Sequence, residues 1–155
     1  MSKSHISAKL RQQVAEKSRY LCCYCQSQQR LIGILLTVEH IIPESLGGSS
    51  TLNNLCLACW DCNLIKGNRI AAIDPQTGTT VRLFNPNKQN WNEHFCWHSD
   101  KIHIIGITPI GRATVVALKL NLQNISHGTT RKARNISVFS VSFRGKKAFV
   151  MFVPN

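Results

Sequence analysis

Residues 38–66 read VEHIIPESLGGSSTLNNLCLACWDCNLIK, and this stretch decides the fold. A carboxylate stands beside a histidine at Glu39-His40, and a glycine-bearing loop follows Pro43. Asn54 then precedes a short apolar run, and a Cys-x-x-Cys pair ends at Cys62. Core packing alone does not require this combination of residue types, so the stretch indicates a chemical site on a small metal-stapled finger.

The order of elements follows from where aliphatic runs, turn residues and helical patterns fall. Aliphatic and β-branched residues predict a strand that delivers Glu39 and His40, and the Gly-Ser cluster predicts a loop after it. The expected order is strand, loop, strand and helix, at 32–38, 43–54, 55–57 and about 60–68.

The cysteines fall into two pairs with metal-ligand spacing. Cys22 and Cys25 form one pair, and Cys59 and Cys62 form the other. Two such turns complete a tetrahedral zinc site, and a closed site of this kind stabilises a fold rather than catalysing a reaction. An odd total of seven cysteines disfavours a disulfide scaffold.

The remaining cysteines carry weaker expectations. Cys23 is a poorer ligand than Cys22 because only one residue separates it from Cys25, so it is left as a spare thiol. Cys56 and Cys96 are expected to be small buried apolar residues. A redox role for the pairs is a third interpretation, weakened by the residues that lie between them.

Charge points to a polyanionic partner. The chain has 19 Lys and Arg against 7 Asp and Glu, a formal net charge of +12. Residues 101–155 hold nine of the basic residues and none of the acidic ones. Nucleic acid is the expected partner, through phosphate contacts. Charge that serves only solubility, or a ribosomal or anionic-membrane partner, is the alternative.

Composition and pattern predict an α+β protein of 155 residues. We expect a helix over 7–20, a strand at 102–104, a helix from Thr108-Pro109 to Leu120, and a β-rich tail over 136–153. The expected division places the helix and finger in residues 1–72 and a basic extension that packs on them in 73–155. Without an apolar span or leader pattern, a cytoplasmic, reducing location is expected.

These residues resemble the HNH endonucleases, the ββα-metal nucleases, and most closely their four-cysteine branch. The resemblance covers roughly residues 20–70 and implies a treble-clef-like, zinc-stapled ββα-metal finger with flanking helices. Segments such as Phe84-Asn85-Pro86 and Thr108-Pro109-Ile110-Gly111-Arg112 also look like a small HNH subfamily common in cyanobacteria.

The resemblance implies a role for each matching position. His40 is the general base, and Asn54 fixes His40 or its loop by a side-chain hydrogen bond. Glu39 and Asn63 hold the catalytic divalent ion, where many relatives have Asp and His. Two hard oxygen ligands favour Mg²⁺ or Mn²⁺ there, beside structural Zn²⁺ at the cysteines.

Phosphate contacts are expected from Lys66 and Arg69 on the helix and from Arg131, Lys132 and Arg134 in the tail. A solvated face is the alternative for the helix residues, and an exposed, poorly packed end is the alternative for the tail. DNA is the expected substrate, with RNA left open. A non-catalytic zinc-finger binder of nucleic acid, derived from such a nuclease, is the competing function. The sequence leaves the target and the oligomeric state open.

Overall fold

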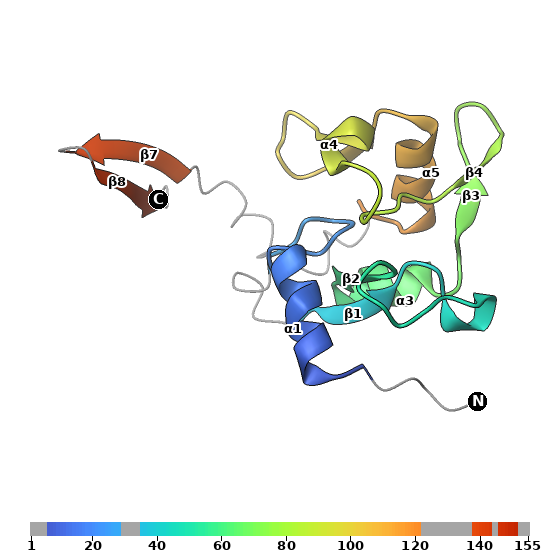
Figure 1. Ribbon diagram of the computed structural model, residues 1–155. Coiled ribbons are helices and arrows are strands. Elements are labelled where there is room, and N and C mark those ends of the chain that lie inside the picture. The colour runs from blue at the N-terminus through green and yellow to red at the C-terminus, as the bar shows by residue number, and fades with distance from the viewer. Residues whose placement is uncertain (1–5, 29–34, 122–137, 144–145, 152–155) are drawn as a thin grey trace.

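The computed structural model describes residues 6–28, 35–121, 138–143 and 146–151, the last two ranges by their backbone. Short helices alternate with two-stranded antiparallel sheets (Figure 1). The helical elements are α1 Ala8–Lys17, the 3₁₀ turn η1 Glu44–Leu46, α3 Trp60–Lys66, α4 Trp91–His94 and α5 Pro109–Ala117. The strands are β1 Thr37–His40, β2 Leu55–Ala58, β3 Ala71–Ile73, β4 Thr80–Arg82, β5 Phe95–Trp97, β6 Ile104–Gly106, β7 Val138–Phe143 and β8 Lys146–Met151.

The finger predicted from the sequence is present as β1, a loop, β2 and α3. The two strands pair antiparallel from Thr37 opposite Ala58 to His40 opposite Leu55. All four β2 residues are buried and belong to the same core cluster as the four paired cysteines. The α+β class and the ββα order are confirmed. The strand expected over 32–38 differs in position: β1 begins at Thr37 and continues to His40, and residues 32–34 lie outside the described part of the chain.

Helix α1 packs on this finger and ends earlier than the sequence pattern predicts. Ser7 caps its first turn, with its Oγ accepting a hydrogen bond from the Leu10 N–H at 3.2 Å. Val14 is its fully buried residue. Arg19 and Tyr20 adopt positive φ angles of 52° and 56°, which no helix continues, so the helix stops at Lys17.

The segment after α3 adds a second layer to the same core. Trp91, Phe95 and Phe84 stack edge to face or tilted against one another, with ring centroids 5.1 Å apart in the pairs Trp91–Phe95 and Phe84–Phe95. The Trp91 indole N–H donates to the Tyr24 carbonyl at 2.9 Å and so ties α4 to the loop that carries the first cysteine pair. In Figure 1, α4, α5 and the β3–β4 hairpin lie on one side of the finger.

One further expectation about the extension differs in detail from the structure. The strand expected at 102–104 begins at Ile104, because Asp100 caps the preceding turn by accepting hydrogen bonds from the N–H groups of Ile102 and His103. The β-rich tail is confirmed as an antiparallel hairpin, β7 with β8.

Candidate functional site

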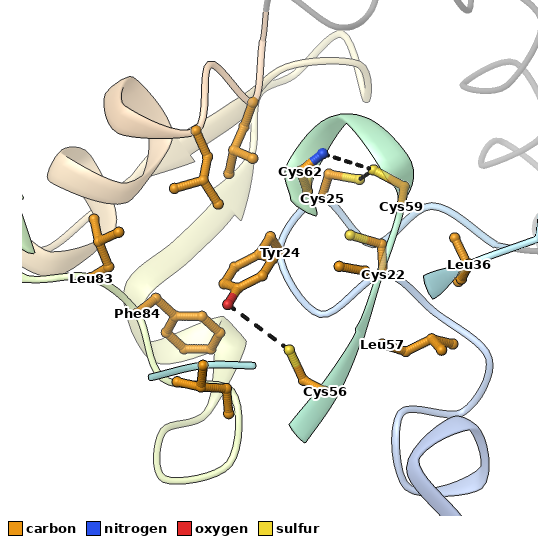
Figure 2. Close-up of a cluster of buried hydrophobic side chains, with 14 of the residues drawn as sticks. Cys22, Tyr24, Cys25, Leu36, Cys56, Leu57, Cys59, Cys62, Leu83 and Phe84 are labelled. Carbon is orange, nitrogen blue, oxygen red and sulfur yellow. Dashed lines mark hydrogen bonds between the residues drawn. The ribbon is translucent and has the colours of Figure 1, made fainter. Parts of the chain in front are cut away.

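The four paired cysteines form one cluster (Figure 2). Their sulfur atoms all lie within 4.8 Å of one another, and the sulfurs of Cys25 and Cys59 are 3.7 Å apart. A tetrahedral zinc ion with bonds of about 2.3 Å needs sulfurs about 3.8 Å apart. The donor set and the spacing therefore fit zinc, as the sequence predicts.

Local backbone structure presents each pair. Cys59 is the N-cap of α3, and its Sγ accepts a hydrogen bond from the Cys62 N–H at 3.4 Å. The first pair lies in a tight turn in which the Gln26 N–H donates to the Cys22 carbonyl, with Gln26 at a φ of 61°. Both turns point two thiols inward from either side of the cluster.

The electrostatics of the cluster favour a bound cation. Burial raises the pKa of the Cys22 thiol well above its usual value, whereas hydrogen bonds from Cys22 and then Cys59 lower that of Cys25. Four ionised thiols cannot share this buried volume without a counter-charge. A metal ion supplies that charge when it binds.

The other cysteines divide between interior and surface. Cys56 is buried, as expected, and its Sγ lies 3.9 Å from the Tyr24 hydroxyl. The expectation for Cys96 is wrong, because it is exposed. It follows Phe95 on a short strand, and since Phe95 points inward its neighbour must point outward.

His40 ends β1 and takes part in a chain of polar side chains. Its Nε2 lies 2.8 Å from Ser50 Oγ, and the Ser50 hydroxyl donates to Glu44 Oε1 at 3.1 Å. The serine has a single proton, and Glu44 accepts it. The Nε2 atom must therefore donate to Ser50, which leaves the lone pair of the neutral imidazole on Nδ1.

Asn54 holds the loop between β1 and β2 rather than His40 itself. Its Oδ1 accepts from the Ile42 N–H at 2.9 Å, and its Nδ2 donates to the carbonyls of Ile42 and Ser49 at 2.9 and 3.0 Å. The loop backbone passes so close that a Cβ on Gly48 would lie 1.7 Å from the Ile42 carbonyl oxygen. Only glycine fits there.

Glu39 is paired with a cation from the chain itself. Lys66 Nζ lies 2.6 Å from Glu39 Oε1 and also donates to the His40 carbonyl at 2.9 Å. Lys66 is 2% exposed. Its expected place on a phosphate-facing surface is therefore corrected: the side chain turns inward because a buried carboxylate needs a partner. Burial raises the pKa of Glu39, and the hydrogen bond from Lys66 opposes that rise.

Asn63 lies one helical turn before Lys66 and faces the same strand. Its Nδ2 donates to Thr37 Oγ1 at 3.0 Å. Glu39 and Asn63 both offer hard oxygens, so their chemistry fits Mg²⁺ or Mn²⁺. A divalent ion at Glu39 would, however, have to compete with the ammonium of Lys66.

Three residues of this site were missed by the sequence analysis. Ser50 and Glu44 orient His40, and only the knowledge that the loop folds back on itself would select them from a polar loop. Asn87 reaches the loop from the extension, and its Nδ2 lies within 3.2 Å of the carbonyl oxygens of Leu52, Asn53 and Leu55. Its Asn-Pro-Asn context indicates only a turn.

Of the other residues expected to contact phosphate, the structure describes only Arg69. Arg69 is exposed beyond α3, and its Nη1 donates to the carbonyls of Ile65 and Ala117. Arg131, Lys132 and Arg134 lie outside the described residues.

A second group with metal-ligand chemistry is exposed at His98, Asp100 and His103. Asp100 Oδ2 lies 3.0 Å from His98 Nδ1 and 2.5 Å from His103 Nδ1. The capping of the turn by Asp100 already accounts for this geometry, since it places both rings beside one carboxylate.

Comparison with known proteins locates a family in the finger. No curated protein and no solved structure matches the chain. Within the described residues, none of the helices has the length and apolar character needed to cross a membrane. The family model of the HNH endonucleases matches residues 22–69, from the first cysteine of the cluster to just beyond α3, so in this segment the chain is similar to an HNH endonuclease domain.

Proposed function

We propose that this protein is an endonuclease that hydrolyses phosphodiester bonds in DNA, with His40 as the general base. The observation that supports it most is the chain from His40 Nε2 through Ser50 to Glu44, which leaves the basic Nδ1 atom for a water molecule. An imidazole serves as a base at neutral pH. The family match over residues 22–69 favours this chemistry.

In the proposed reaction His40 Nδ1 takes a proton from water as the water oxygen attacks phosphorus. The bond from phosphorus to the leaving sugar oxygen breaks, and that oxygen takes up a proton from solvent. Ser50 and Glu44 stabilise the imidazolium that forms, because the protonated ring still donates from Nε2. Asn54 acts indirectly, by holding the loop that carries Ser50.

A divalent ion, Mg²⁺ or Mn²⁺, is proposed at Glu39 and Asn63. When bound it would stabilise the charge that develops on the phosphate oxygens. Because Lys66 Nζ is paired with Glu39 Oε1, the ion and the ammonium would compete for the same carboxylate. Isothermal titration of Mn²⁺ into wild type and Lys66→Met tests this: tighter binding by the variant is expected, and equal binding would contradict the competition.

One observation favours the competing function, a nucleic-acid binder that does not cut. The carboxylate proposed as a metal ligand already has a cation as its partner. The two functions separate in a single assay, because both predict binding to DNA and only one predicts cleavage.

Supercoiled plasmid tests the proposal directly. Incubation with the protein and Mg²⁺ or Mn²⁺ is expected to give nicked circles, and EDTA is expected to stop the reaction. Binding to plasmid without nicking in either metal would select the non-catalytic function.

A further inference from the structure

A basic groove lies directly beside the loop that follows His40. It has a volume of about 430 Å³, and one wall is formed by Ile41 and Ile42, the two residues that follow the proposed base. Lys66, which donates to the His40 carbonyl, lines it as well. The groove and the candidate catalytic loop therefore share a wall.

The charged residues of the groove all have the same sign. Arg69, Arg82 and Lys88 line it together with Lys66, and its other lining residues are apolar or amide side chains. The three besides Lys66 are exposed. They come from the segment after α3, from β4 and from the turn after β4, so three separate parts of the chain bring positive charge to one place.

These cations are available to a ligand. Within the part of the chain that the structure describes, Arg82 and Lys88 form no ion pair and no side-chain hydrogen bond, and neither does Arg69 beyond its two contacts through Nη1. Those contacts fix the Arg69 guanidinium in place, and its Nη2 and Nε donate no hydrogen bond to any of the described residues. A fixed, planar guanidinium is suited to phosphate.

We infer that this groove binds the phosphate backbone of the nucleic-acid strand that the candidate site would cut. Arg69, Arg82 and Lys88 contact phosphates next to the scissile one, and the sugar lies against the apolar wall at Ile42, which is 39% exposed. This inference rests on the proposed function for its ligand, and it assigns Arg82 and Lys88 to substrate binding.

The test is the salt dependence of DNA binding by Arg82→Gln/Lys88→Gln. The probe is a fluorescein-labelled duplex of about 20 base pairs in EDTA, so that binding is measured without cleavage. The slope of log K against log salt is negative, and each lost phosphate contact makes it less negative by about one. The slope measured for the double variant should therefore be less negative than the wild-type slope by about two.

The matched control is Lys9→Gln/Arg19→Gln, which removes the same charge from two exposed residues outside the groove. Its slope should stay at the wild-type value. Equal slopes for the groove variant and wild type would overturn the inference, and so would an equal loss in the control, which would assign the effect to net charge.

Nicking assays separate this inference from the proposed function. If the groove variant has a shallower salt slope than wild type but wild type cuts no plasmid, the proposed function is wrong and the inference that the groove binds phosphate is supported. If wild type cuts plasmid and the groove variant binds and cuts equally well, the inference that the groove binds phosphate is wrong and the proposed function is supported.

Discussion

Lys66 Nζ and Glu39 Oε1 lie 2.6 Å apart in the interior of the finger, joining α3 to β1. The side chains are 2% and 10% exposed, so this is a buried ion pair rather than a surface contact. It lies directly behind His40, whose carbonyl accepts a second hydrogen bond from the same ammonium. The pair therefore sets the position of the strand end that carries the proposed base.

Lys66→Met should destabilise the fold by about 3–5 kcal/mol, because it leaves the Glu39 carboxylate buried without a partner. Urea unfolding at neutral pH measures this. Adding Glu39→Gln should restore part of the loss, since no buried charge then remains. Lys9→Met, at an exposed helix position, is the matched control and should change stability by less than about 0.5 kcal/mol. Equal stability of Lys66→Met and wild type would show that the pair is not formed.

One equivalent of zinc should purify with each chain, bound by the four clustered cysteines. Cys59→Ser and Cys62→Ser should each lose the metal and unfold or aggregate, because closed zinc sites supply folding free energy. Metal analysis and circular dichroism report the two effects. Cys96→Ser should keep both zinc and fold, as its thiol is exposed. Folded protein without zinc would contradict the assignment.

Asp74 should make stability depend on pH in the acid range. Its carboxylate accepts hydrogen bonds from Arg112 Nε and Nη2 at 2.8 and 2.7 Å, and these hold its pKa well below the usual value. A depressed pKa contributes stability above the unfolded value of about 3.9, and the contribution is lost as pH falls below it. The stability advantage of wild type over Asp74→Asn should thus shrink between about pH 5 and pH 2. A constant difference would disprove the linkage.

The tail should also contribute to binding if its charge meets phosphate. Arg131→Gln/Lys132→Gln/Arg134→Gln should make the salt slope of DNA binding less negative by about one for each contact that is lost. The measurement is the titration used for the groove, and combining both sets of changes should give additive losses of slope. An unchanged slope would assign the tail's charge to solubility.

Local signals in the sequence predict most of the finger. Cysteine spacing identifies the metal cluster, and the order of strand, loop, strand and helix follows from aliphatic runs and glycines. What local signals miss are contacts between distant segments. Nothing near Lys66 indicates that it turns inward to Glu39, and nothing near Asn87 indicates that it holds the loop at residues 52–55.

Element ends show the same limit. The helical pattern runs on to Tyr20, but the backbone of Arg19 and Tyr20 turns left-handed after α1, and apolar periodicity does not encode that turn. The strand pattern at Ile102 is overridden by the turn that Asp100 caps. Where a long-range partner or a cap decides the conformation, apolar periodicity is a weak guide.

His40→Ala is the most direct test of the proposed function. This variant is expected to abolish measurable plasmid nicking in Mg²⁺ or Mn²⁺, since a general base contributes roughly 10²–10⁴-fold. Zinc content and the salt slope of DNA binding should stay at wild-type values, because His40 belongs to neither the cysteine cluster nor the basic groove. Equal nicking by His40→Ala and wild type would show that His40 is not the general base.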